Sequence, residues 1–301
     1  FLSNLDTLSL RDSYIAASTV DGDAGDLLVN NGGMPASNIT LNTGFLTVGA
    51  TGRGNGGLIS LNARQVNLRN SLISASTGSG VGIGVDLQGL DTLQLSGSQI
   101  VAATRTGQAG NVSIVATGEI DLRNNSVLSV GATNGGIAGD LTIAADRLNL
   151  RSGSQATVSS PFGQAGNLSI VANHVLLDRG TLSAETGGAG GNGANINLQV
   201  LQTPLLMRFG SLISASAKDF ANGGNITISA PFILGVLFED SDIEANAVQG
   251  QGGNISITTD AIFGLQFQPK DTPRSDITAS SQFGLSGTVI LNTLNIDPSQ
   301  G

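Results

Sequence analysis

The chain has 301 residues, a net charge of −9 at pH 7, only 12% charged residues and no cysteine. An acidic chain without a cluster of Lys and Arg is a poor nucleic-acid binder, and the lack of cysteine excludes a disulfide framework, a thiol catalyst and a cysteine metal site. No run approaches the roughly 20 apolar residues of a membrane helix, so we expect no membrane span.

One short unit recurs along nearly the whole chain. It reads Gly-Asn-Leu-Ser-Ile at residues 166–170. Related openings begin near positions 26, 111, 140, 195, 225 and 254, and degenerate ones lie near 57, 86 and 288. A period of about 29 residues indicates a solenoid or a propeller.

Each unit holds three segments with the pattern of a strand. The opening is followed by an apolar-x-apolar step, such as Leu8 and Leu10 or Ile120 and Leu122. A small turn pair and a second alternation follow, as at residues 70–76. Alternation with period two is typical of strands, and the glycine-rich stretches between units are typical of corners.

These features predict an all-β protein, a right-handed parallel β-helix of about ten rungs with three short strands per rung. A propeller blade needs about 40 to 50 residues, and parallel crossovers are overwhelmingly right-handed. We expect a single β-helix domain over residues 1–301. It comprises a partial first rung at 1–25, regular rungs at 26–260 and a divergent C-terminal rung or cap at 261–301, where Phe263, Phe267 and Pro269 break the repeat.

An asparagine recurs at the start of most units. Asparagines at equivalent positions of stacked coils can form a ladder of side-chain amides. We therefore expect a structural ladder made by Asn111, Asn167, Asn195, Asn225 and Asn254.

Two acidic groups are candidate cation sites. Asp21, Asp23 and Asp26, with glycines between them, resemble half of a calcium loop, although full loops have more ligands at fixed offsets. In the second group, alternation would place Asp240, Asp242 and Glu244 on one face of a strand. The structural alternatives are a solvated acidic turn for the first group and a solvated strand face for the second. Calcium is the one candidate ion, and no other cofactor is expected.

Arginine follows the apolar-x-apolar step in several units. The candidate glycan contacts are Arg69, Arg123, Arg151 and Arg208, and Arg11 has the same position. They should lie along one edge of the rod, with Asp178 interrupting the series. Such an edge could bind sulfated or uronic glycans, or it could keep the sheet soluble and unpaired.

The repeated units resemble the filamentous haemagglutinin family, the exoproteins of bacterial two-partner secretion, and most closely its cyanobacterial members. The resemblance rests on Gly-Asn-Leu-Ser-Ile, then Leu-x-Leu-Arg, then Gly-Ser-x-Ile-Ser-Ala-Ser, and is strongest at residues 139–160 and 166–185. It implies a right-handed β-helix exported through an outer-membrane partner and displayed or released outside the cell. The family's secretion domain is not recognisable here, so we expect a fragment from the distal part of a longer exoprotein.

The resemblance and the repeat favour a non-enzymatic extracellular rod, part of a large bacterial adhesin or surface filament. Its expected partners are the exporter and cell-surface or matrix glycans or proteins. Two alternatives stay open. One is a polysaccharide-active β-helix, a lyase or hydrolase built on the acidic groups, although His174 is the single histidine and excludes a histidine pair. The other is a matrix fibre subunit that stacks end to end.

Overall fold

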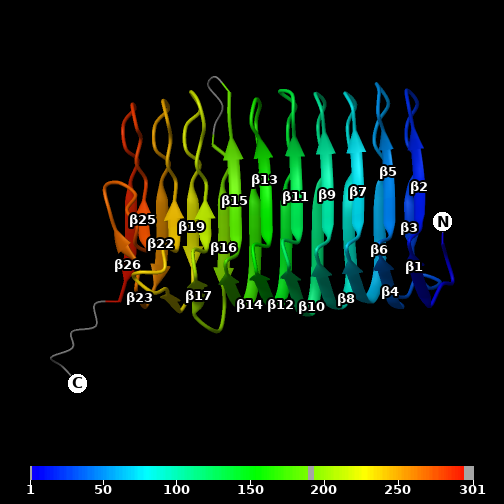
Figure 1. Cartoon of the computed structure of the whole chain (residues 1–301), viewed down its shortest axis with the longest axis horizontal. Coiled ribbons are helices and arrows are strands. Elements are labelled where there is room, and N and C mark those ends of the chain that lie inside the picture. Colours follow the sequence, from blue (N-terminus) through cyan, green and yellow to red (C-terminus); the bar gives the residue numbers. More distant parts are fainter. Residues whose placement is uncertain (1, 189–192, 295–301) are drawn as a thin grey trace.

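The protein is a long stack of parallel strands. The computed structural model describes residues 2–188 and 193–294, and every regular element in these ranges is a β-strand. The strands lie side by side along the long axis, and the chain advances coil by coil from its N-terminal end to its C-terminal end (Figure 1). Each strand pairs in parallel with its counterpart one coil on, for example β10 with β12. The predicted parallel β-helix is confirmed.

The larger sheet, here called sheet A, has 15 strands. Its main path is β1 (Thr7–Arg11), β4 (Ala36–Asn42), β6 (Leu58–Arg69), β8 (Gly84–Ser96), β10 (Asn111–Arg123), β12 (Leu141–Arg151), β14 (Leu168–Asp178), β16 (Ile196–Val200), β19 (Ile226–Ser229), β22 (Ile255–Thr259) and β26 (Val289–Thr293). Off this path lie β3 (Leu27–Val29), β17 (Leu205–Arg208), β20 (Phe232–Leu234) and β23 (Ala261–Phe263).

The second sheet, sheet B, has 11 strands, and its buried side chains share one core with those of sheet A. In order these are β2 (Tyr14–Thr19), β5 (Phe45–Ala50), β7 (Leu72–Thr77), β9 (Gln99–Thr104), β11 (Val127–Ala132), β13 (Gln155–Ser160), β15 (Thr181–Thr186), β18 (Leu212–Ser214), β21 (Asp242–Glu244), β25 (Asp276–Thr278) and β24 (Gln266–Phe267).

The three strand segments expected in each coil are present, but the first two are often joined. In the coils of β6, β8, β10, β12 and β14 they form one continuous strand, with a register shift such as that between Val115 and Glu119 where the chain bends. In later coils they separate, as β16 from β17 and β19 from β20. Pro204 and Pro231 lie at these breaks, and proline cannot donate to the ladder of a sheet.

The core is one continuous column of aliphatic side chains between the sheets. Alternate residues of each strand point inward, so Val112 and Ile114 of β10 stack in register on Leu141 and Ile143 of β12. All four are fully buried. Each coil therefore supplies a thin slice of core, and it gains stability by stacking on its neighbours.

Buried serines form a hydrogen-bonded ladder at the corner where the chain passes from sheet A to sheet B. The backbone N–H of Ser98 donates to Ser126 Oγ (3.2 Å), and the N–H of Ser126 donates to Ser154 Oγ (3.2 Å). These serines are fully buried. The preceding residue often has a positive φ, as at Asn125 (59°) and Gly153 (78°), a conformation that favours Gly and Asn.

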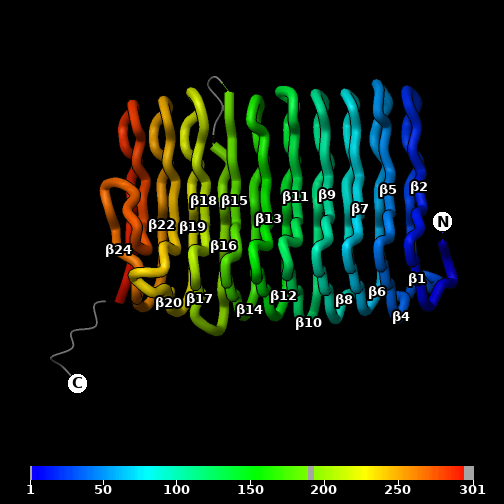
Figure 2. The backbone as a smooth tube through the Cα atoms, viewed as in Figure 1, coloured from blue at the N-terminus to red at the C-terminus, as the bar shows by residue number. Residues whose placement is uncertain are grey.

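The two ends of the rod differ. At the N-terminal end, β1 pairs with β4 and β2 with β5, and neither has a second partner among the described strands. At the other end β24 pairs with the outer edge of β25, although it precedes β25 in the chain, and Figure 2 shows its segment lying beside the last coil. The predicted divergent segment 261–301 thus includes a strand out of sequence order, and its residues 295–301 lie outside the described part. No helix in the described residues is long and apolar enough to cross a membrane.

Candidate functional site

The predicted asparagines lie in a hydrogen-bonded row at the corner where each coil enters sheet A. Asn195 Nδ2 donates to Asn167 Oδ1 (2.9 Å), and both the backbone N–H and Nδ2 of Asn225 donate to Asn195 Oδ1 (3.0 Å each). Asn254 Nδ2 continues the row to Asn225 Oδ1 (3.0 Å). Asn111 joins it through Asp140, whose backbone N–H donates to Asn111 Oδ1 (2.9 Å).

Aspartate fills one position of this row and glycine packs beneath it. Asp140 Oδ1 accepts the backbone N–H of Asn167 (2.7 Å), so a carboxylate replaces an amide as acceptor. A Cβ placed on Gly166 would lie 2.2 Å from the carbonyl oxygen of Gly139. The Gly-Asn pair of the repeated unit therefore serves coil stacking: glycine permits the close approach and the next side chain caps the neighbouring coil.

The first acidic group does not converge on one point. Asp23 Oδ1 accepts the N–H of Asn55 (2.8 Å) and Asp26 Oδ1 accepts the N–H of Leu58 (2.8 Å). Asp21 is exposed. Two of these three carboxylates thus cap the backbone of the following coil, as the asparagines do further along.

The second acidic group is divided among three surroundings. Asp240 is exposed and has a φ of 55°, so the expected alternation does not extend back to it from β21. Glu244 accepts a hydrogen bond from Asn246 Nδ2 (3.0 Å). Asp242 is half-buried beside Asp271 and Asp276 of the following coil, and its pKa is raised to about 7, chiefly by burial and then by the neighbouring carboxylates.

The arginine row is present along sheet A but is less regular than expected. In register, Arg69 lies beside Ser96, Ser96 beside Arg123, and Asp178 between Arg151 and Arg208. Arg123 pairs with Asp121, and Arg151 Nε lies 3.7 Å from the same carboxylate. Asp121 is 2% exposed, so two arginines cover one buried negative charge.

A hollow of about 530 Å³ lies on the outer surface of sheet A, over β4, β6, β8 and β10. Its floor repeats polar side chains coil by coil. Thr40, Asn67 and Gln94 occupy one row, and Asn42, Arg69 and Ser96 occupy the next. Arg123 and Asn124 close its far end, and the described residues that line it include Arg69 and Arg123 but no carboxylate.

A second hollow, of about 400 Å³, lies further along the same surface. Its lining includes Glu119, Arg147, Asn149, Arg151 and His174. Glu119 Oε1 accepts a hydrogen bond from Asn149 Nδ2 (2.6 Å). The pairs of Asp121 with Arg123 and Arg151 stand between the two hollows, and we call the two hollows together the outer groove. Three of the four candidate glycan arginines line it, whereas Arg208 does not.

His174 lies at the edge of the second hollow. Its Nδ1 is 3.0 Å from Thr203 Oγ1, and its Nε2 is 4.0 Å from Asp146 Oδ1. The resulting line of hydroxyl, imidazole and carboxylate superficially resembles a nucleophilic triad. The carboxylate is too far away to accept a hydrogen bond from the ring, and Thr203 Oγ1 also lies within 3.4 Å of the carbonyl oxygen of Asn173. The contacts join three consecutive coils.

Arg208 lies beyond the groove and is held by a carboxylate. Glu239 binds its guanidinium through two oxygens and also accepts the N–H of Phe209 (2.9 Å). The hydrogen bond from Arg208 is the largest cause that lowers the pKa of Glu239 to about 2. Arg208 and Arg179 also lie against the ring of Phe209, at 4.5 and 5.1 Å from its centroid.

Sequence reasoning did not identify two sets of residues. The polar row of Thr40, Asn67 and Gln94 had a signal, since each is the middle residue of an apolar-x-apolar step. A sequence signal also existed for the proximity of Asp242 and Asp276, because Asp242-Ile243 and Asp276-Ile277 are equivalent in successive coils. No repeat-based signal places Asp271, which lies in an irregular loop.

The chain matches no family model, no curated protein and no solved structure.

Proposed function

We propose that the protein is a non-enzymatic extracellular rod, part of a bacterial surface adhesin or filament of the two-partner secretion type, which contacts anionic glycans through the outer groove. The observation that carries the glycan contact is the first hollow, where amide, hydroxyl and guanidinium groups repeat from coil to coil without a carboxylate.

The spacing of the coils suits a linear polymer. Parallel strands lie about 4.8 Å apart, so a chain lying along the rod meets the same kinds of donor and acceptor at each step. Arg69 is exposed and has no ion-pair partner among residues 2–188 and 193–294. Its guanidinium is therefore free to bind a carboxylate or sulfate with two parallel hydrogen bonds.

Charge supports an anionic ligand over a neutral one. The whole chain is acidic, with a net charge of −9, yet the named lining of the first hollow carries only positive charge. A local positive surface on an acidic rod selects a ligand by charge at that place and repels it elsewhere.

Two further lines support the secreted rod. The stacked coils give an elongated body in which each unit contacts only its neighbours. The repeated motifs resemble those of filamentous haemagglutinins, and export to the cell surface or medium follows from that resemblance. A chain without cysteine is also free of disulfides that would obstruct threading through an exporter.

A polysaccharide-active enzyme is the second candidate, favoured by the second hollow. Glu119 and His174 line it together with two arginines. Glycoside hydrolysis commonly needs two carboxyl groups that flank the bond, and Glu119 is the one acid among the described residues that line this hollow. Binding is therefore the better supported activity. Release of reducing ends or of unsaturated products from uronic polymers would favour the enzyme instead.

The test is binding of the whole chain to a panel of sulfated, uronic and neutral polysaccharides. We expect retention on the anionic polymers, weaker binding at high salt, and no retention on neutral ones. Arg69→Gln should weaken binding about tenfold, the loss of roughly one charge-assisted pair.

Arg105→Gln is the matched control, because this exposed arginine lies in a turn after β9 and does not line the groove. It has the same change in charge and should bind like the unmodified chain. Equal losses in both variants would indicate a nonspecific effect of net charge. A chain that binds none of the polymers would contradict the glycan contact. The extracellular location is a separate part of the proposal, and localisation of the protein tests it.

A further inference from the structure

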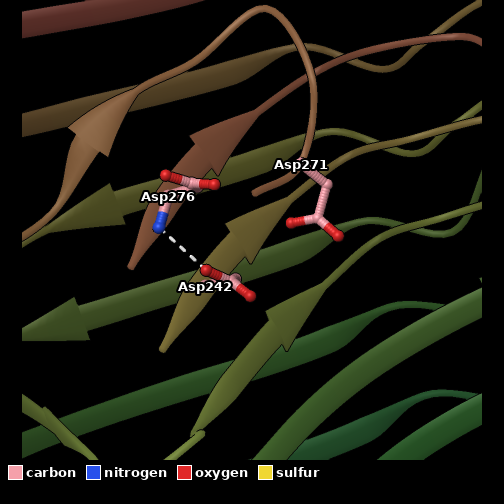
Figure 3. A group of neighbouring side chains, drawn as sticks. All are labelled: Asp242, Asp271 and Asp276. Atoms are coloured by element: carbon pink, nitrogen blue, oxygen red, sulfur yellow. Dashed lines mark hydrogen bonds between the residues drawn. The ribbon is translucent and has the colours of Figure 1, made fainter. Parts of the chain in front are cut away.

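Three carboxylates converge at the C-terminal end of sheet B. Asp242 is on β21, Asp276 is the first residue of β25, and Asp271 is in the loop between β24 and β25. One oxygen from each lies within 4.8 Å of the others. Figure 3 shows the three groups around a common space, with one oxygen of Asp276 directed towards Asp271.

Hydrogen bonds hold two of these groups in place. Asp242 Oδ1 accepts the backbone N–H of Asp276 (2.8 Å), and Asp276 Oδ2 accepts the N–H of Thr272 (2.7 Å). The loop and the two strands are thus fixed relative to one another. The arrangement is built by backbone contacts rather than by chance proximity of mobile surface side chains.

Two buried oxygen atoms at this place have no hydrogen-bond partner in the part of the chain that the structure describes. Asp276 is 1% exposed, and its Oδ1 has no donor. Thr272 Oγ1 is also buried without a partner. Leaving such an atom unsatisfied is destabilising, and more so for a charged group, so an occupant that supplies positive charge would remove the penalty.

The charge of the cluster is not balanced by protein cations. Among the described residues, no Lys, Arg or His forms an ion pair with Asp242, Asp271 or Asp276. Arg274, three residues after Asp271, lies instead against the ring of Phe238 (5.4 Å). Burial, which is partial at Asp271, and repulsion by nearby carboxylates raise the pKa of Asp271 as well as that of Asp242. Either protons or a metal ion must compensate the negative charge of these carboxylates.

We propose that Asp242, Asp271 and Asp276 bind a divalent cation, with Ca²⁺ as the preferred ion, and that this ion fixes the loop between β24 and β25 to the end of sheet B. Calcium takes oxygen ligands at about 2.3–2.6 Å, so oxygens on opposite sides of the ion are about 4.6–5.2 Å apart. The three oxygens all lie within 4.8 Å of one another, which is below the upper end of this range, so one ion can reach all three. Asp271 is exposed, which leaves one side open for water ligands.

The site links elements that the repeat alone does not join. The irregular loop carries Asp271 and Thr272, and β24 lies outside β25. A shared ion would connect this loop to two successive coils. The order of strands in sheet B departs from the repeat here, because β24 follows β25 in the sheet, so the ion would act at this irregularity.

The test is calorimetric titration of the chelator-treated whole chain with CaCl₂ and, separately, MgCl₂, together with thermal unfolding in each. We expect calcium to bind with one site per chain, to raise the melting temperature, and to bind more tightly than magnesium. Asp271→Asn should weaken calcium binding at least about tenfold, because a charged ligand is lost. This residue is exposed, so the variant should fold.

Asp242→Asn is the second variant, since its amide oxygen can still accept the N–H of Asp276. Asp240→Asn is the control: this exposed carboxylate is nearby and contributes repulsion, but it is not one of the three groups. It should bind calcium within about twofold of the unmodified chain. Absence of binding up to about 10 mM, above the weakest calcium modules, or equal affinity in Asp271→Asn, would overturn the proposal and assign a shared proton to the cluster.

Discussion

Arg208 and Glu239 form a two-point ion pair between neighbouring coils, with Nε to Oε2 at 2.7 Å and the terminal nitrogen to Oε1 at 2.8 Å. The pair joins the end of β17 to the turn that precedes β21. It also fixes the N–H of Phe209, whose φ is positive. One carboxylate therefore stabilises both a side chain and a corner of the backbone.

The stability that this pair supplies should be lost in acid. The pKa of Glu239 is lowered from 4.5 to about 2 in the folded chain. Its contribution is thus present above pH 4.5 and declines as the pH falls towards 2. Glu239→Gln should lower the melting temperature at pH 6, and the difference from the unmodified chain should shrink at pH 3. A difference that is constant with pH would show that the carboxylate gains nothing from being ionised.

Asp242 should give a pH dependence of the opposite sign. Its folded pKa of about 7 is above the ordinary 3.8, so the folded state holds the extra proton between these values. Stability should fall as the pH rises from about 4 to 7. In chelator, the melting temperature should drop more for the unmodified chain than for Asp242→Asn between pH 5 and 8. Identical pH profiles would mean that Asp242 is already ionised at pH 5.

The buried serine ladder can be tested at Ser126. Its Oγ accepts the N–H of Ser98 and donates to the carbonyl of Arg123 (2.7 Å). Ser126→Ala leaves a buried N–H without a partner, which should cost about 1–3 kcal/mol in urea unfolding. Ser113→Ala on the outer face of β10 is the control, because Ser113 is only partly buried, and it should be close to neutral. Equal stability of both variants would argue against the ladder.

The asparagine row makes a prediction about amino-acid type. Asn195→Ala loses a donor and an acceptor, whereas Asn195→Asp keeps the acceptor that Asn225 uses. The aspartate variant should be the less destabilised, as Asp140 already serves this role, and the alanine variant should lose about 1 kcal/mol. Asn197→Ala, at an exposed position of β16, provides the control. An alanine variant as stable as the aspartate variant would contradict the role of the acceptor.

Close coil packing can be tested with two glycines. A Cβ on Gly166 would lie 2.2 Å from the carbonyl oxygen of Gly139, while a Cβ on Gly131 would lie 3.5 Å from the nearest atom. Gly166→Ala should therefore destabilise the chain by about 1–3 kcal/mol. Gly131→Ala should be tolerated, and both can be followed by thermal unfolding. Equal tolerance would mean that the corner can widen without cost.

The repeat determined what could be predicted. A period-two pattern that returns every coil fixes which side chains face inward, so the buried pairs of Val112 with Leu141 and Ile114 with Ile143 follow from alignment of the units. It also places equivalent side chains beside one another, which gives the row through Asn167, Asn195 and Asn225. The junction of the first two strands was harder to predict, because Pro204 and Pro231 break some coils while others bend through a register shift.

The candidate sites were less accessible to sequence reasoning. An arginine row is visible in the repeats, but its pairing with Asp121 depends on a neighbour in the middle of the step. Asp271 approaches Asp242 and Asp276 only because the loop after β24 returns to begin β25 beside it, and no periodicity describes a single irregular loop. The extended pattern of Asp240, Asp242 and Glu244 failed at its first residue, where the turn needs a positive φ.

The hydrogen-bonded corner has a consequence for the length of the rod. Each coil presents to the next the same geometry of donors and acceptors that it receives from the one before, with partners 27 to 30 residues apart in sequence. Whole units can therefore be gained or lost in evolution with little change in cross-section, whereas an insertion of one residue within a strand would turn the inward side chains outward. The distance that the molecule spans can therefore be adjusted in discrete steps.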